Sequence, residues 1–171
     1  MLRDVLVGAD EGEALWFFGM LVLVKASSGD TDDQFSLTEQ RARRGTATPF
    51  HRQIADQETF HVLDGKLRFY LDEGEPIVAG AGATLYIPAG AAHAFEVVSE
   101  TARWLNLTTP NHEAFFRAAA DPAQARTYPP EQAPDMPRVM AAAERYGVGI
   151  LGPPPGGRPD WGRRRGAAGG A

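Results

Sequence analysis

The chain has 171 residues, a net charge of −5 at pH 7 and no cysteine. This length fits one domain with a single sizeable core, and the acidic balance argues against a nucleic-acid or anionic-membrane partner, since both attract clustered Lys and Arg. Without cysteine, disulfides and thiolate zinc sites are excluded.

The first apolar segment, residues 15–25, is rich in aromatic and branched side chains and predicts a strand that is buried on both faces. It is too short to cross a bilayer, and acidic residues precede it where a signal peptide would be basic, so we expect a cytoplasmic protein. Residues 27–33 predict a polar turn. The alternation of apolar and polar residues at 35–40 predicts a strand with one solvent-exposed face.

Short strand-like segments then recur between turn residues. The expected strands cover residues 46–53, 57–63, 66–72, 83–88, 92–99 and 102–109. Asp64-Gly65 predicts a tight hairpin in which Gly65 takes a positive φ, and residues 79–82 predict a further turn. Many short strands at this spacing indicate an antiparallel sandwich or barrel.

Helical patterns follow residue 110. We expect Asn111 to cap a helix that ends near Ala120, and Asp135 to begin a second helix that ends near Gly147. The chain shows no internal repeat, so one barrel is expected. The predicted organisation is a barrel with N-terminal strands at 1–110, a helical segment packed on it at 111–151, and a flexible Pro/Gly/Arg tail at 152–171.

Two spaced motifs lie in the middle of the chain. The first runs Gly45, five residues, His51-Arg52-Gln53, four residues, Glu58, six residues and Gly65; the second runs Gly82, five residues, Pro88-Ala89-Gly90, two residues and His93. They resemble the signature motifs of the cupin superfamily, G-x5-H-x-H-x(3,4)-E-x6-G and G-x5-P-x-G-x2-H-x3-N. The chain departs from them twice, because Gln53 replaces the second histidine and Val97 replaces the final asparagine.

This resemblance implies a mainly β fold, namely a single cupin barrel (a jelly-roll-like, double-stranded β-helix) with C-terminal helices. Within the superfamily, the chain looks most like the small bacterial cupins grouped with quercetin 2,3-dioxygenase. The aromatic strand that leads into Val24-Lys25 and the segment 146–154 add to this likeness. Members are often dimers, so we expect a homodimer.

The motif residues also imply a metal site. His51 and Gln53 are two apart on a strand and leave the same face, Glu58 is expected across the strand pair, and a closed barrel brings His93 to them. Two histidines and a carboxylate suit Fe(II) and related divalent ions. Gln53 is the candidate fourth ligand, directly or through water, and its neutral amide favours Fe, Mn, Ni, Co or Zn over copper.

The sequence also predicts where several side chains outside the ligand set lie. The candidate substrate pocket consists of Phe60, Val62, Phe95 and Val97. His61 is offset by an odd number from Glu58 and should face away from the site. His112 falls in the first turn of a helix, where we expect it on the surface. Residues 16–18 are expected in the core, with a member of this aromatic cluster as a possible pocket residue.

The family resemblance implies that Glu58 is both a ligand and a base, which takes a proton from a substrate hydroxyl before O2 attacks. The expected function is therefore a metal-dependent dioxygenase that acts on a small enolic or aromatic hydroxyl substrate. One alternative is a cupin-type polyketide cyclase or isomerase, which uses the metal as a Lewis acid and consumes no O2. A second is a non-catalytic small-molecule binding barrel.

Overall fold

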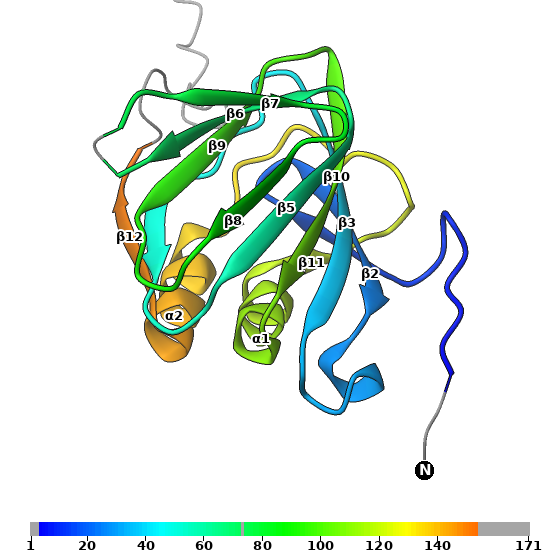
Figure 1. Cartoon of the computed structure of the whole chain (residues 1–171). Coiled ribbons are helices and arrows are strands. Elements are labelled where there is room, and N and C mark those ends of the chain that lie inside the picture. The colour runs from blue at the N-terminus through cyan, green and yellow to red at the C-terminus, as the bar shows by residue number, and fades with distance from the viewer. Residues whose placement is uncertain (1–3, 73, 154–171) are drawn as a thin grey trace, which may run out of the picture.

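The computed structural model describes residues 4–72 and 74–153, so the expected tail lies outside the described residues from residue 154 onward. Within this part of the chain, the strands form two antiparallel sheets around one apolar core (Figure 1). The larger sheet contains, in spatial order, β11 (Asp121–Pro122), β1 (Glu13–Phe17), β2 (Met20–Ala26), β3 (Ser36–Arg43), β10 (Thr101–Thr108), β5 (Glu58–Asp64) and β8 (Thr84–Ile87). The smaller sheet contains β12 (Val148–Gly152), β4 (Phe50–Gln53), β9 (His93–Val97), β6 (Lys66–Leu71) and β7 (Ile77–Gly80). The predicted mainly β, jelly-roll-like barrel is confirmed.

The N-terminal apolar segment is a hairpin, and the prediction of one strand over residues 15–25 was wrong. β1 and β2 pair in antiparallel register around a turn at Phe18 and Gly19, whose φ angles are 47° and 81°. Two positive φ values suit a two-residue hairpin turn. Phenylalanine rarely occupies such a position, so the apolar composition concealed the turn.

The predicted hairpin at Asp64-Gly65 was also wrong, although Gly65 does take a positive φ of 77°. β5 pairs with β10 and β8, whereas β6 pairs with β9 and β7. The turn is therefore a corner that carries the chain from one sheet to the other. A Cβ at Gly65 would lie 2.2 Å from the Thr101 carbonyl oxygen, so this corner requires glycine for space as well as for φ.

The described residues include a short 3-10 turn (Ser28–Asp30) and two α-helices, α1 (Pro110–Ala119) and α2 (Met136–Tyr146). α2 begins after the predicted cap, Asp135, and ends at Gly147 in the left-handed conformation. The cap of α1 was predicted wrongly. Thr109 caps it by accepting a hydrogen bond from the backbone of His112, and Pro110 takes the first helical turn, where its missing N–H has no cost.

Three strands were not predicted: β12, β7 and the two-residue β11. β12 lies within the segment that was expected to be helical and pairs with β4, so the chain returns to the barrel after α2. Its two glycines obscure any alternation of apolar and polar residues. β7 includes Ala79 and Gly80, which had been interpreted as part of a turn.

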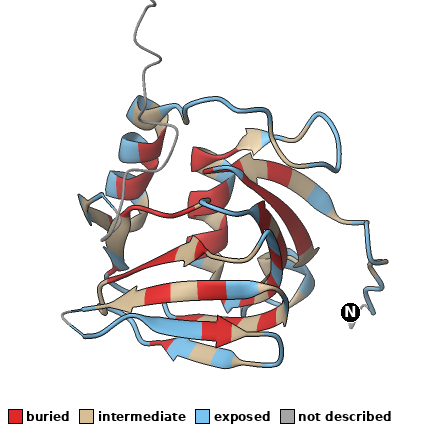
Figure 2. Ribbon diagram, turned by 90° about the horizontal axis from the view of Figure 1, so that it is seen from above, coloured by how far each residue is buried: buried red, intermediate tan, exposed pale blue. Residues whose placement is uncertain are grey.

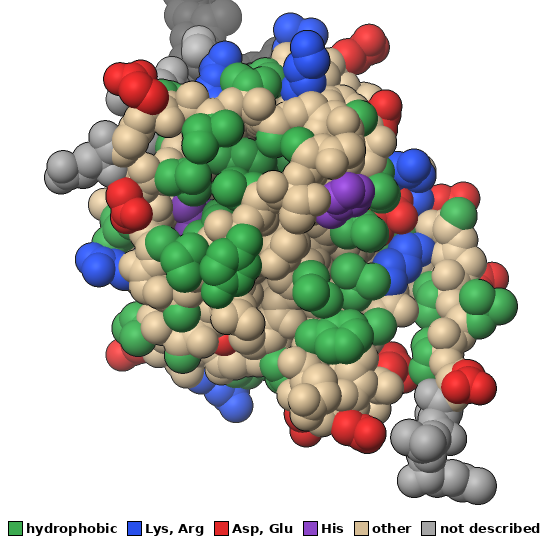
Figure 3. All heavy atoms as spheres, in the orientation of Figure 1, with side chains coloured by type: hydrophobic (Ala, Val, Ile, Leu, Met, Phe, Trp, Pro, Cys, Tyr) green, Lys and Arg blue, Asp and Glu red, His purple; other side chains and the backbone are tan. Residues whose placement is uncertain are grey.

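Apolar side chains fill the space between the sheets and the two helices. Figure 2 shows buried positions alternating with exposed ones along several strands and marking one side of each helix. Exposed apolar residues also occur on β7 and β8, each of which lies at one edge of its sheet. Ile77, Val78 and Tyr86 are about half-exposed there. Figure 3 shows hydrophobic side chains exposed on the face of the molecule that Figure 1 presents. No helix in the described part of the chain combines the length and apolar character of a membrane span.

Candidate metal and active site

Two histidines face each other from neighbouring strands of the smaller sheet. His51 on β4 and His93 on β9 are paired in register, with ring centroids 4.4 Å apart. The Nδ1 atom of His51 lies 2.8 Å from the Pro49 carbonyl oxygen, and that of His93 lies 3.2 Å from the Ala91 carbonyl oxygen. Because a carbonyl oxygen only accepts, each Nδ1 carries a hydrogen, and each Nε2 is the ring atom directed into the site.

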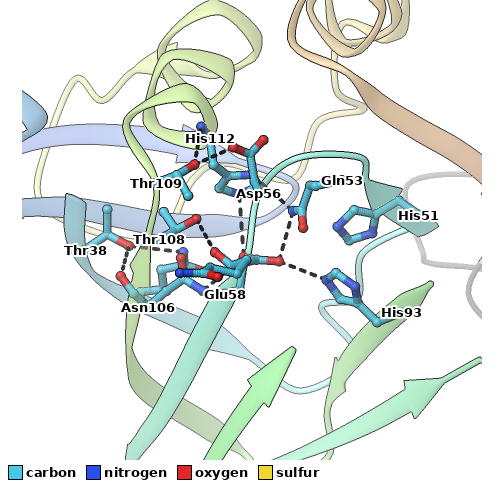
Figure 4. Close-up of polar contacts among 12 residues, drawn as sticks. Thr38, His51, Gln53, Asp56, Glu58, His93, Asn106, Thr108, Thr109 and His112 are labelled. Carbon is cyan, nitrogen blue, oxygen red and sulfur yellow. Dashed lines mark hydrogen bonds and ion pairs between the residues drawn. The ribbon is translucent and has the colours of Figure 1, made fainter. Parts of the chain in front are cut away.

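Glu58 approaches these histidines from the opposite sheet. The expectation that it meets His51 across a strand pair was wrong, because β4 and β5 belong to different sheets. Its Oε2 atom lies 2.9 Å from the Nε2 atom of His93. One ligand atom from each of the three residues lies within 4.8 Å of the others (Figure 4). The structure thus brings the predicted ligand set together across the barrel interior.

Two amides hold the Glu58 carboxylate. Gln53 Nε2 donates to Oε2 over 2.9 Å, and Asn106 Nδ2 on β10 donates to Oε1 over 3.0 Å. Carboxylate oxygens only accept, so Gln53 must direct its nitrogen toward Glu58. In Figure 4 its oxygen lies on the side of the two histidines. The sequence analysis missed Asn106, whose signal is a polar residue at an inward-facing position of an alternating strand.

His112 is the largest correction to the expected site. It was predicted on the surface, but it is 2% exposed. Its Nδ1 atom lies 3.0 Å from Gln53 Nε2, and its Nε2 atom lies 3.5 Å from Glu58 Oε1. The available signal was helical spacing, because Phe115 and Phe116 follow at three and four residues and mark the buried face to which His112 belongs.

Burial and charge set the protonation of the site. Loss of hydration, assisted by His93, lowers the pKa of His51 to about 4, so this ring is neutral at pH 7. Burial alone would raise the pKa of Glu58, but the imidazoles of His112 and His93 lower it well below its usual range. Burial also lowers the pKa of His112. For His93, the hydrogen bond and charge of Glu58 outweigh burial and raise the pKa above its usual value.

Comparison with known proteins agrees with this architecture. Residues 39–108 match the Cupin_2 family, described as a cupin domain. The chain is also 27% identical over 145 residues to quercetin 2,3-dioxygenase from Bacillus subtilis (strain 168), an alignment that covers 84% of this chain and 43% of that protein. Residues 39–108 form a cupin domain. The chain resembles the quercetinase but spans less than half of its length.

Solved structures show the same fold. The polyketide cyclase RemF from Streptomyces resistomycificus is 25% identical, with a TM-score of 0.52 over 64% of this cupin and 80% of the cyclase. KdgF from Halomonas sp. is 16% identical, with a TM-score of 0.56 over 63% of this cupin and 94% of that chain. At that identity, the second likeness shows only the fold.

The cupin's donor set fits a divalent cation. Typical nitrogen and oxygen ligands lie about 2.0–2.2 Å from such an ion, so two ligands of one ion are at most about 4.4 Å apart. The ligand atoms of this cluster all lie within 4.8 Å of one another, which is near that limit. The backbone carbonyls that orient both imidazoles are the usual outer partners of metal-binding histidines. His51, Glu58 and His93 can therefore hold a metal ion.

A pocket adjoins the cluster and is partly open to solvent. Of the predicted pocket residues, Phe60 and Phe95 line it, whereas Val62 and Val97 lie in the core and are not among its lining residues. The β1–β2 hairpin and α1 supply many of the other lining residues. Of these, the sequence analysis had connected only the aromatic cluster at residues 16–18 with the pocket. Its lining is Phe17, Phe18, Met20, Gln40, Thr48, Pro49, His51, Glu58, Phe60, His93, Phe95, His112, Phe115, Phe116, Val148 and Ile150.

The remaining histidine faces away from this site, as expected. His61 on β5 places its Nδ1 atom 2.8 Å from the hydroxyl of Thr84 on β8. It shares a strand with Glu58 but takes no part in the cluster, so it provides a matched control for substitutions in the site.

Proposed function

We propose that this cupin is a metal-dependent dioxygenase that acts on a small enolic or aromatic hydroxyl substrate with O2. The observation that carries the proposal is the position of an ionised Glu58, with His51 and His93, at the wall of an aromatic cavity. The likeness to quercetin 2,3-dioxygenase supports it. When bound, a divalent ion would lower the pKa of a substrate hydroxyl and supply the site at which O2 chemistry takes place.

Glu58 is the residue that accepts the substrate proton. Its lowered pKa keeps the carboxylate ionised and able to accept a proton, and proton transfer to it is easiest from a hydroxyl that is already acidic. Enols and phenols meet this requirement better than simple alcohols. The amides of Gln53 and Asn106 keep the carboxylate in place while the proton is transferred.

The cavity favours a flat apolar substrate without strong negative charge. Six phenylalanines line it, from both sheets and from α1, and its lining contains no Lys or Arg within the described residues. An anionic substrate such as a dicarboxylate would therefore lose hydration without gaining a cationic partner other than the metal. An aromatic enol or phenol would pack against the phenylalanine faces and edges.

A second candidate function is a metal-dependent cyclase or isomerase. The 25% identity and TM-score of 0.52 to the polyketide cyclase RemF favour this candidate. The same Glu58 would then move a proton between substrate atoms without net oxidation. A non-catalytic binding barrel is the remaining alternative.

Oxygen uptake separates these functions. The protein is purified anaerobically, its metal content is measured, and flavonols and polyketide-like phenols are added in an oxygen-electrode cell. The dioxygenase proposal predicts that one O2 is consumed for each substrate molecule converted. Conversion without O2 uptake would establish the cyclase or isomerase instead. Ligand binding without conversion, by protein that contains no metal, would establish the binding barrel.

Metal affinity is expected to rise with pH. In the cation-free protein, the raised pKa of His93 keeps its ring protonated at higher pH than a free imidazole. A metal ion needs the Nε2 lone pair, so binding must expel this proton. We therefore expect the Co²⁺ dissociation constant to fall as pH rises from 6 through the pKa of His93 and to level off above it. A dissociation constant that does not change over this interval would contradict protonated His93 as the competitor.

A further inference from the structure

Gln53 occupies the position of a cupin ligand, but an amide has one end that can bind a cation and one that cannot. Its nitrogen donates to Glu58 Oε2 and lies 3.0 Å from the Nδ1 atom of His112. This nitrogen has two hydrogens, which matches these two acceptors. With the nitrogen committed to both, only the oxygen of Gln53 can turn toward His51 and His93, as Figure 4 shows.

His112 itself is not placed as a ligand. Its Nδ1 atom accepts the hydrogen of Gln53, so its Nε2 atom carries the ring hydrogen and faces Glu58 Oε1 at 3.5 Å. Neither nitrogen then has a lone pair free for a cation. Among the described residues, the cluster whose ligand atoms converge contains His51, Glu58 and His93 and does not include His112.

The first turn of α1 holds His112 firmly. Asp56, in the connection between Gln53 and Glu58, accepts hydrogen bonds from the Thr109 hydroxyl and from Asn111 Nδ2. The connection that separates the two site residues is therefore tied to the helix that carries His112. The imidazole also packs edge-to-face on Phe116, with ring centroids 4.6 Å apart and an interplanar angle of 87°.

We propose that His112 is a positioning residue for the metal site: it orients the amide of Gln53 so that the oxygen faces the cation. The inference rests on the proposed metal site and deepens it. In this cupin, the imidazole missing from position 53 is replaced by two residues, an amide that supplies the oxygen and a helix histidine that fixes its direction. Loss of a partner that orients a ligand typically lowers metal affinity about 10–100-fold.

The test is a double-mutant cycle on cation-free protein titrated with Co²⁺. His112→Phe keeps an aromatic ring beside Phe116 but removes the acceptor for Gln53. We expect it to weaken Co²⁺ binding about 10–100-fold in the wild-type background. In the Gln53→Ala background, it should change the affinity by no more than about twofold, the usual error of additivity.

A matched pair of variants provides a second readout that does not depend on the stability of the phenylalanine variant. His112→Asn places an oxygen close to the position of Nδ1 and should retain Co²⁺ affinity within about twofold. His112→Gln moves the amide beyond that position and should lose affinity as His112→Phe does. Equal affinities for the Asn and Gln variants would overturn the positioning role.

The outcomes also separate this inference from the metal site itself. An equal loss on His112→Phe in both backgrounds would show that His112 acts without Gln53, as a ligand or as packing, and would overturn the inference while leaving the metal site intact. Wild-type protein that binds no Co²⁺ at all would overturn both. Loss confined to the background that contains Gln53 supports the inference.

Discussion

Glu58→Ala is expected to weaken metal binding by more than about 100-fold, beyond the range for loss of an outer partner, and to abolish O2 uptake. The substitution removes one ligand and the proposed base together. It also leaves Gln53, Asn106 and His93 directing their polar atoms at an empty space. The measurement is metal content by mass spectrometry after dialysis, followed by the oxygen-electrode assay.

Matched variants define the specificity of this effect. His51→Ala and His93→Ala should lose metal to a similar extent, whereas Gln53→Ala should be milder because its amide is a weaker, neutral donor. His61→Ala alters a histidine on the same strand as Glu58, outside the cluster, and should retain metal. Equal metal content in all of these proteins would refute the proposed ligand set.

Trp104→Ala should have the largest effect on stability, a loss of about 3–5 kcal/mol in the free energy of unfolding. Trp104 on β10 is fully buried, and its ring packs edge-to-face on Phe95 with centroids 5.2 Å apart. Its removal leaves a cavity beside a residue that also lines the pocket next to the metal-ligand cluster. Urea denaturation followed by circular dichroism measures the loss.

The control lies on the same strand. Leu107 on β10 is 40% exposed, so Leu107→Ala should cost less than about 1 kcal/mol. A comparable loss for both variants would mean that the packing around Trp104 is not the main source of the strand's stability. The midpoint and the slope of the urea transition should be compared, because a changed slope indicates a changed unfolded state.

Motif spacing was sufficient to anticipate which side chains converge at the site. The two motifs placed His51, Glu58 and His93 correctly relative to the barrel interior, because two-residue parity along a strand fixes which face a side chain takes. The spacing did not reveal which strands are neighbours. Glu58 was expected beside His51 in one sheet, but the chain crosses between sheets after β4.

The local sequence pattern could not predict features that depend on contacts between distant segments of the chain. His112 appears polar and near a helix end, and only the packing of α1 on the barrel buries it beside Gln53. Gly65 correctly indicated a turn, but the partners of the flanking strands decide whether a turn is a hairpin or a corner. The turn at Phe18 was missed for another reason. The backbone of Phe18 makes the turn, but its apolar side chain lines the pocket and therefore resembles that of a buried strand residue.

The central claim is that one cation lies between the two sheets, held by His51, Glu58 and His93. Anomalous X-ray diffraction from crystals of the wild-type protein loaded with Co²⁺ tests it most directly. A single anomalous peak within about 2.0–2.3 Å of both Nε2 atoms and a Glu58 oxygen is the expected result. Peaks only at surface sites, with the Glu58 carboxylate still hydrogen-bonded to His93 Nε2, would contradict the account.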